Sequence, residues 1–269
     1  MSDQVFQGKA ALVTGAGVGI GYEIARMLAA QGAAVMLNDL DPALAQQAAA
    51  QIEQAGGKCR ATGGDVADVN AVRAMVEAAV AAFGRLDMVV ANAGLTLYGD
   101  FFSYQPQDFD RVTGVNLRGS YFLAQAAARQ MRAQGSGGAI LLMSSVTGHQ
   151  AIRYLSAYGM TKAALEMLAR NLVVELSPYN IRINAVAPGA VLTPRNLADD
   201  PNYEASWSRV IPMSKAITPT DIAEAALFLL SPKAASITGQ TLIVDGGWSA
   251  VSATPELDFV QKEGDFKSD

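Results

Sequence analysis

The sequence predicts a single doubly wound α/β domain with a parallel sheet, on the strength of three observations. Short apolar runs alternate along the chain with longer helical patterns, the order typical of βαβ units. The apolar runs do not alternate with polar residues, as expected for a sheet that helices cover on both faces. No Pro/Ser-rich linker interrupts the 269 residues, so we expect one domain over residues 1–250 and an extension over residues 251–269.

The predicted strands are brief apolar segments of the kind that a two-sided core buries. The segment at 59–63 has the weakest pattern among them. The strands are expected at residues 9–13, 34–38, 59–63, 88–91, 139–143, 181–187 and 241–244.

The helices predicted between these strands have recognisable starts and stops. Pro42 stands in the first turn of one helix, where its missing N–H costs nothing, and Pro178 ends another. The segment at 188–218 is predicted to be a long irregular loop, and a loop of this length is usually functional, often as a lid. The helices are expected at residues 19–31, 42–55, 69–83, 106–133, 156–177 and 219–230.

Composition and charge exclude several classes of protein. The net charge of −5 argues against a nucleic-acid surface, because phosphates attract stripes of Lys and Arg. No run of about 18 apolar residues is present to span a bilayer, and no signal-peptide pattern is visible, so the expected location is the cytoplasm. Cys59 is the one cysteine and His149 the one histidine, so we expect no disulfide and no structural metal site.

A glycine-rich turn follows the first predicted strand. Glycine lets the chain turn sharply and lets a pyrophosphate approach the backbone, and the helix that follows offers free N–H groups to that anion. The spacing differs from the common G-x-G-x-x-G, and a tight turn packed against a helix is the alternative interpretation. The turn reads Thr14-Gly15-Ala16-Gly17-Val18-Gly19-Ile20-Gly21.

Asp39 follows the second predicted strand, at the offset where an acid binds the hydroxyls of the adenosine ribose. A carboxylate there repels the additional phosphate of NADP, and its neighbours Asn38, Leu40 and Asp41 include no Arg to reverse that preference. We therefore predict NAD as the cofactor. The alternative role for Asp39 is an N-cap of the helix at Pro42, which Asp41 fills better.

Two further motifs stand at predicted strand ends. Asp65-Val66 follows the third strand, and Asn92-Ala93-Gly94 follows the fourth. Ligands of open parallel sheets bind at this carboxyl edge, so both motifs are candidates for cofactor contact, with adenine near the first. Turn chemistry alone is the alternative for either motif.

Tyr158 and Lys162 stand one helical turn apart and share a helix face. A nearby ammonium lowers the pKa of a phenol, so the pair would exchange protons near neutrality. Ser145 follows the strand at 139–143, so its hydroxyl is expected to face the same site and bond the substrate oxygen. Asn116 lies within the long predicted helix, where the sequence alone favours a solvent-facing position.

Together these motifs make the chain resemble the short-chain dehydrogenase/reductase family over roughly residues 7–250. The resemblance implies a Rossmann-type fold, a homotetramer, and hydride transfer to or from a nicotinamide. Ala91 stands where many members have a second Asn. Val18 stands where NADP-preferring members often carry a basic residue, which supports NAD. The motifs are the glycine-rich turn, Asp65-Val66, Asn92-Ala93-Gly94, Asn116, Ser144-Ser145, Tyr158-x-x-x-Lys162 and Pro188-Gly189.

The resemblance also implies residue roles. Tyr158 would be the general acid/base and Ser145 the partner of the substrate oxygen. Lys162 would bind the nicotinamide ribose and lower the tyrosine pKa. Asn116 would help to hold a water molecule of a proton relay behind Lys162, which replaces the solvent-facing expectation. The nicotinamide would be flanked by Pro188, Gly189 and Thr193, with backbone bonds to its carboxamide from Val191.

The substrate pocket is expected between residues 95–98, residues 147–154 and a lid at 195–214. For His149 a structural hydrogen bond is the alternative to substrate contact, and for Arg153 a solvated surface charge. The mixture of polar and aromatic side chains expected in this pocket fits a sugar, a polyol or another small polar alcohol better than a steroid. Its polar and aromatic members are His149, Gln150, Arg153, Tyr154, Arg195, Asn196, Tyr203, Trp207 and Arg209.

Two other functions compete with a sugar or polyol dehydrogenase. The chain is also similar to 3-oxoacyl-carrier-protein reductases, which usually take NADPH. The third possibility is a dinucleotide-binding regulator without activity, but such a protein should have lost part of the set Asn116, Ser145, Tyr158 and Lys162. The acidic tail after Val251 is expected to be a solvated end, with packing of residues 257–260 on a neighbouring subunit as the alternative.

Overall fold

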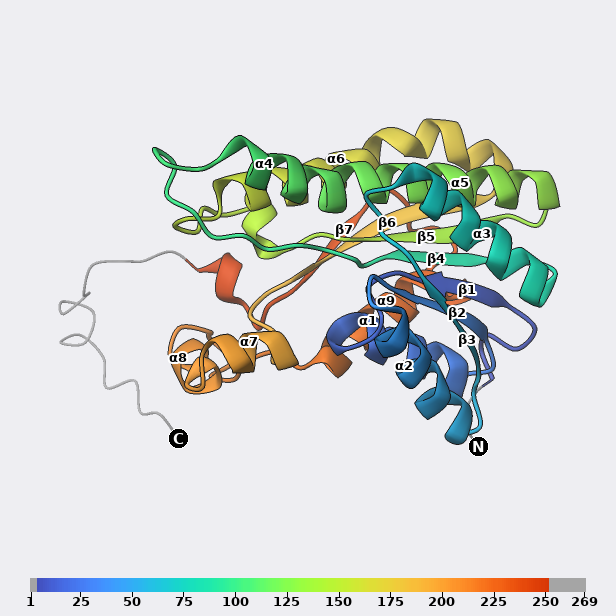
Figure 1. Cartoon of the computed structure of the whole chain (residues 1–269), viewed down its shortest axis with the longest axis horizontal. Coiled ribbons are helices and arrows are strands. Elements are labelled where there is room, and N and C mark those ends of the chain that lie inside the picture. The colour runs from blue at the N-terminus through green and yellow to red at the C-terminus, as the bar shows by residue number, and fades with distance from the viewer. Residues whose placement is uncertain (1–3, 252–269) are drawn as a thin grey trace, which may run out of the picture.

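The computed structural model of the protein describes residues 4–251, so both interpretations of the tail, including residues 257–260, lie outside the described range. Seven parallel strands form one sheet in the order β3-β2-β1-β4-β5-β6-β7 (Figure 1). Every predicted strand is present, with its ends shifted by at most one residue. The strands are β1 (Ala10–Val13), β2 (Ala34–Asp39), β3 (Lys58–Gly63), β4 (Met88–Ala91), β5 (Gly138–Met143), β6 (Ile181–Pro188) and β7 (Thr241–Val244).

Helices cover both faces of the sheet, which confirms the doubly wound prediction (Figure 1). Each face has its own apolar core: Leu28, Val35 and Leu227 belong to one, and Leu123 and Leu165 to the other. Residues on the inner strands are buried on both sides, which is why these strands are apolar throughout. One layer contains α1 (Gly19–Ala30), α2 (Pro42–Gln54) and α9 (Pro219–Leu230), and the other contains α3 (Val69–Phe83), α4 (Pro106–Thr113), α5 (Ser120–Gln134) and α6 (Ser156–Leu176).

The strand order reverses between β1 and β4. The chain leaves β1 toward β2 and β3 on one side, then returns through α3 to β4 on the other side of β1. The connections diverge at this point and leave a crevice at the carboxyl ends of the strands. The glycine-rich turn after β1 and the Asn92 motif after β4 therefore meet there.

Two sequence predictions about the helices were wrong. Residues 106–133 do not form one continuous helix, because a π-helical segment, η1 (Gly114–Gly119), separates α4 from α5. The segment at 188–218 is not wholly irregular: it contains the short helices α7 (Pro194–Asp199) and α8 (Tyr203–Ser208), and Val191 forms a parallel bridge with Ile217. Thr193 starts α7 by accepting a hydrogen bond from Asn196 N at 3.2 Å.

Local details of the fold agree with the sequence. Asp41 is the N-cap of α2, as expected, and accepts from Ala43 N at 2.9 Å. Cys59 lies buried in β3, and burial raises the pKa of its thiol to about 12. Among residues 4–251, no helix combines the length and the apolar character that crossing a membrane requires.

Candidate active site

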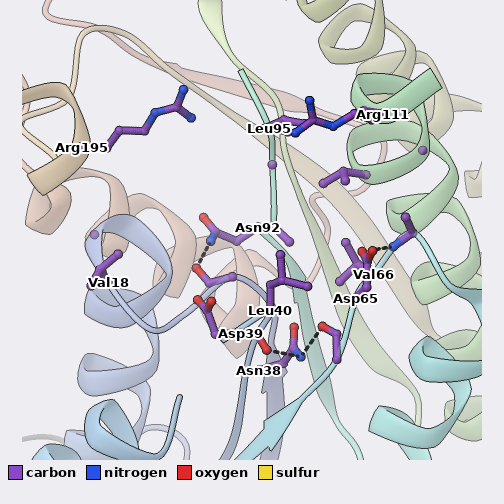
Figure 2. A pocket seen from close by; sticks show the side chains of 18 of the residues that line it. Val18, Asn38, Asp39, Leu40, Asp65, Val66, Asn92, Leu95, Arg111 and Arg195 are labelled. Atoms are coloured by element: carbon purple, nitrogen blue, oxygen red, sulfur yellow. Dashed lines mark hydrogen bonds between the residues drawn. The ribbon is translucent and has the colours of Figure 1, made fainter. Parts of the chain in front are cut away.

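The glycine-rich turn joins β1 to α1 and is held in place from β4. Asn92 Nδ2 donates to the carbonyl oxygens of Thr14 at 3.0 Å and Gly15 at 2.8 Å, and Figure 2 draws the second of these bonds. A Cβ on Gly21 would lie 2.5 Å from that same Nδ2, so this close approach requires glycine. No side chain caps α1, which begins at Gly19, so its first N–H groups are available to an anion.

A cavity of about 780 Å³ lies beside this turn, over the carboxyl ends of β1, β2 and β4 (Figure 2). Asp39 borders it from the end of β2, and its Oδ2 accepts from Gly17 N at 3.0 Å. A Cβ on Gly17 would lie 2.8 Å from that oxygen, so the close approach of the turn to the carboxylate requires glycine at this position. Eleven predicted cofactor residues line this cavity: Gly15, Val18, Gly19, Ile20, Asp39, Asp65, Val66, Asn92, Ala93, Gly94 and Thr193.

Two arginines that the sequence reasoning did not single out also line this cavity. Arg111 pairs with Asp108 at 3.3 Å, and Arg118 donates from Nη1 to the carbonyl of Ala67 at 2.5 Å. They come from α4 and η1, far from Asp39 in the chain, so an inspection of the neighbours of Asp39 does not find them.

Ser145, Tyr158 and Lys162 converge between the ends of β5 and β6. All three line a cavity of about 220 Å³ that also contains Asn92 and Gly94 of the dinucleotide side. Lys162 Nζ lies 5.3 Å from the centroid of the Tyr158 ring and donates to the carbonyl of Met143 at 2.7 Å. Ser145 starts the turn after β5, where its Oγ accepts from Thr147 N at 3.2 Å.

The proton affinities of this group differ from the sequence expectation. Burial raises the pKa of the Tyr158 phenol, while the nearby hydroxyls of Ser145 and Thr96 and the charge of Arg195 act in the opposite direction. Burial also lowers the pKa of Lys162, to about 8. The Tyr158 pKa therefore lies above its usual value and not below it as expected, because removal of the phenol from water outweighs the groups that lower its pKa.

Asn116 is fully buried in η1, so the solvent-facing position expected from sequence alone was wrong. Its Nδ2 donates to Leu95 O at 3.0 Å and to Thr161 Oγ1 at 3.2 Å, and its Oδ1 accepts from Leu95 N at 2.7 Å. A Cβ on Gly94 would lie 3.5 Å from Lys162 Nζ and 3.7 Å from Asn116 Oδ1. The π-helical segment thus brings the amide to the lysine end of the site.

The end of β6 and the residues after it line the same cavity. Pro188, Gly189, Val191 and Thr193 all line it, as predicted for residues beside a nicotinamide. The Val191 carbonyl accepts from Thr193 N at 2.8 Å and from Asn196 Nδ2 at 2.9 Å.

A third cavity, of about 410 Å³, adjoins Ser145 and Tyr158 on the lid side. Predicted pocket residues reach it from the segments at 95–98 and 147–154 and from the lid. Trp248, which follows β7, was not predicted, because no local sequence pattern distinguishes it. The side chains that give the cavity its character are Thr96, Tyr98, Asn196, Asp199, Asp200, Tyr203, Trp207 and Trp248.

His149, Gln150, Arg153 and Tyr154 were expected near the substrate, but they line a separate hollow. His149 Nε2 lies 2.9 Å from Glu166 Oε1, so the structural hydrogen bond given as its alternative is confirmed. The Arg153 guanidinium is exposed and lies over the Tyr154 ring, 4.9 Å from its centroid.

Glu166 is a buried acid that the sequence reasoning missed. It accepts from Ser144 Oγ at 2.7 Å, and a Cβ on Gly148 would lie 2.8 Å from its Oε1. Glu166 stands one turn after Lys162 on α6, while Ser144 and His149 come from the segment that carries Ser145. This network therefore ties the serine segment to the helix of Tyr158 and Lys162.

Comparison with known proteins gives this geometry a family. The family described as "Enoyl-(Acyl carrier protein) reductase" matches residues 15–249. The chain is 40% identical over 246 residues to an L-rhamnose 1-dehydrogenase (NAD(P)(+)) of Azotobacter vinelandii, covering 89% of this chain and 96% of that protein. It is also 40% identical over 255 residues to a short-chain dehydrogenase/reductase of Armillaria gallica, covering 91% and 98%. The chain belongs to the short-chain dehydrogenase/reductase family.

Solved short-chain dehydrogenase/reductase structures share the whole described fold. One from Mycobacterium marinum has a TM-score of 0.87 and 33% identity, covering 92% of this chain and 98% of its own. A 7α-hydroxysteroid dehydrogenase solved with NADH and 7-oxo glycochenodeoxycholic acid has a TM-score of 0.86 and 35% identity, covering 91% and 96%. The protein is therefore an oxidoreductase of a family that binds a nicotinamide dinucleotide.

Proposed function

We propose that this protein is an NAD-dependent dehydrogenase that oxidises a secondary alcohol of a sugar, a polyol or a similar small polar molecule. The observation that carries the proposal is the position of Ser145, Tyr158 and Lys162. All three line the cavity of about 220 Å³ that Asn92 and Gly94 also border, and Ser145 and Tyr158 line as well the cavity of about 410 Å³ with polar and aromatic walls.

The residues that would hold the dinucleotide fit such a group. The uncapped start of α1 and the turn around Gly17 would favour a pyrophosphate, Asp39 would hold the ribose hydroxyls, and Asp65-Val66 would contact the adenine. When bound, the nicotinamide supplies a hydride acceptor. Lys162 would hold its ribose, and the backbone at Val191 its carboxamide.

The chain's own residues would then remove the proton. Ser145 would hold the substrate oxygen, and Tyr158 would take the hydroxyl proton as the carbon loses its hydride, which leaves a carbonyl product. Asn116 would keep a water molecule behind Lys162, through which the proton leaves the site. Each step uses a group that lines the cavity shared by these residues or lies beside it.

NAD is the proposed cofactor because of Asp39 and Val18. A carboxylate at the ribose repels a 2′-phosphate, and Val18 offers it no positive charge. The size and polarity of the lid-side cavity support a small polar alcohol, and the resemblance to an L-rhamnose 1-dehydrogenase points the same way.

We further propose a homotetramer. Exposed apolar side chains lie on two pairs of elements: Tyr121, Met160, Met167 and Val174 on α5 and α6, and Phe228 and Leu242 on α9 and β7. β7 is also an edge strand, with pairing positions open on one side. Two self-complementary interfaces of this kind build a tetramer with two-fold symmetry.

The test is NADH formation with a panel of sugars, polyols and simple secondary alcohols, run with NAD and NADP in parallel. Turnover of a sugar or polyol with NAD supports the proposal. If no alcohol of the panel is oxidised and a 3-oxoacyl thioester is reduced with NADPH, the protein is instead a 3-oxoacyl reductase, and the proposed role of Asp39 is overturned. No turnover in either direction, with dinucleotide binding intact, would favour the regulator.

A further inference from the structure

We infer that Tyr203 donates a hydrogen bond to a second oxygen of the substrate, and that Asn196 fixes this direction of donation. The substrate is then an alcohol with another oxygen close to the reacting carbon, such as a vicinal diol or a ring sugar. This inference rests on the proposed dehydrogenase function and narrows its substrate class.

The direction follows from a short chain of hydrogen bonds. Asn196 Nδ2 lies 2.9 Å from Val191 O and 3.2 Å from the Tyr203 hydroxyl oxygen. A backbone carbonyl only accepts, so the amide must turn its NH₂ toward Val191. The same NH₂ then donates to Tyr203, whose oxygen acts as an acceptor. The Tyr203 proton has no acceptor among the described residues and is left for a ligand.

Tyr203 lies in the same cavity as Tyr158 but would have a different role there. Both side chains line the lid-side cavity, and Ser145 lies in it with them. Burial raises the pKa of Tyr203 to about 12, with the neighbouring phenols and the Asp200 carboxylate acting in the same direction. Tyr203 therefore remains a protonated hydrogen-bond donor at neutral pH.

The surroundings make a missing acceptor costly. Tyr203 lies against Trp207, with ring centroids 5.8 Å apart, and Trp207 meets Trp248 edge-on at 4.7 Å. A substrate without the second oxygen would cover this hydroxyl with apolar surface and leave its proton unpaired. Sites built to bond a substrate hydroxyl discriminate against analogues that lack it for this reason.

The chain provides its own probe of this cavity. Both of its tryptophans, Trp207 and Trp248, line it. Quenching of tryptophan fluorescence therefore gives dissociation constants for this cavity without cofactor or turnover.

The experiment compares cyclohexanol with trans-1,2-cyclohexanediol, in kcat/KM with NAD and in the fluorescence titration. We expect the wild-type protein to prefer the diol in both assays. Tyr203→Phe should reduce that preference by about tenfold, the value of one hydrogen bond. Asn196→Asp should do the same, because a carboxylate accepts from Tyr203 and reverses the bond. Tyr98→Phe removes another phenol from the same cavity and should keep the wild-type preference within about twofold.

The outcomes separate the two proposals. An unchanged diol preference in Tyr203→Phe, or an equal loss in Tyr98→Phe, overturns the inference while the dehydrogenase function stands. If neither alcohol is oxidised with either dinucleotide, that result counts against the proposed function. The fluorescence titration alone then tests the role of Tyr203. Equal dissociation constants for the two alcohols, or no binding of either, would then reject the role of Tyr203.

Discussion

Lys162 is a charged side chain held almost entirely out of water, at 3% exposure. Burial lowers its pKa from 10.5 to about 8, so its charge costs the folded state on the order of 3 kcal/mol below pH 8. Its bond to the Met143 carbonyl does not remove that cost. The site thus keeps a destabilising charge where the proposed chemistry needs one.

We therefore expect Lys162→Met to change how stability depends on pH. Below pH 8 both the folded and unfolded wild-type chains carry the charge, so the penalty is complete. Between pH 8 and about 10 the folded state loses the proton first, and wild-type stability recovers. The free energy of unfolding of the variant relative to wild type should be highest near pH 7 and fall toward pH 10, as urea denaturation would measure. A difference independent of pH would show that the buried lysine is not charged at neutral pH.

Tyr158→Phe tests the proposed acid/base. We expect turnover to fall by about 10²- to 10⁴-fold, the usual contribution of a positioned proton acceptor. Wild-type oxidation should rise with pH, because the deprotonated phenol is the base and burial raises its pKa. NADH binding, followed by its fluorescence, should stay close to wild type. Wild-type-like turnover would remove Tyr158 from this role.

Asp39→Ala tests the choice of cofactor. Removing the carboxylate removes its repulsion of a 2′-phosphate and its bond from Gly17 N. We expect the ratio of kcat/KM for NAD over NADP to shrink by about tenfold or more, since close like charges are worth over 1 kcal/mol. Asp41→Ala, which removes the neighbouring helix cap instead, is the control. An unchanged ratio would assign cofactor selection to another residue.

The sequence predicted the site best where a motif follows a strand. Asn92 and Ser145 converge because parallel strands end at one edge, which their spacing already implies. Glu166 and Trp248 were missed for opposite reasons. Glu166 looks like any acidic helix residue until His149 and Ser144 fold against it, and Trp248 reaches the cavity only through the path of the chain after β7.

At the scale of elements, the turn between β1 and α1 leaves no room for a side chain at Gly21. We expect Gly21→Ala to reduce stability by about 1–3 kcal/mol, because the added methyl would meet Asn92 Nδ2 and the carbonyl of Gly15. Dinucleotide affinity should fall with it. Gly114→Ala is the matched control, since the nearest atom to its Cβ is 3.8 Å away. Denaturation and NADH titration of both variants measure this, and equal behaviour would contradict the packing argument.

The strands were predictable, whereas two features of the helices were not. An apolar run buried on both faces marks a strand whatever surrounds it, which explains the agreement for the inner strands β1, β2, β4, β5 and β6. A π-helical segment changes the hydrogen-bond pattern without a proline or a break in composition, so η1 left no trace in the pattern. α7 is equally short, but Thr193-Pro194 at its start was a readable cap signal.

At the scale of the whole molecule, Val174 tests the proposed tetramer. It is 78% exposed near the end of α6, on the surface that a second copy would cover in the proposed tetramer. We expect the wild-type protein to sediment as a tetramer and Val174→Asp to sediment as a smaller species, because burying an unpaired charge at an interface is costly. Val210→Asp, at an exposed apolar position on the lid side, should leave the mass unchanged. A monomeric wild-type protein would overturn the tetramer.

The buried thiol of Cys59 can report how often the structure opens locally. Its thiol is buried in β3 and stays protonated at any ordinary pH, so a thiol-directed reagent finds no nucleophile in the closed sheet. Labelling must then wait for β3 to separate from β2 and α2. The labelling rate therefore measures how readily β3 opens. Because β3 ends beside the cavity that Asp65 lines, a bound dinucleotide should slow the labelling of Cys59 even in a catalytically inactive variant.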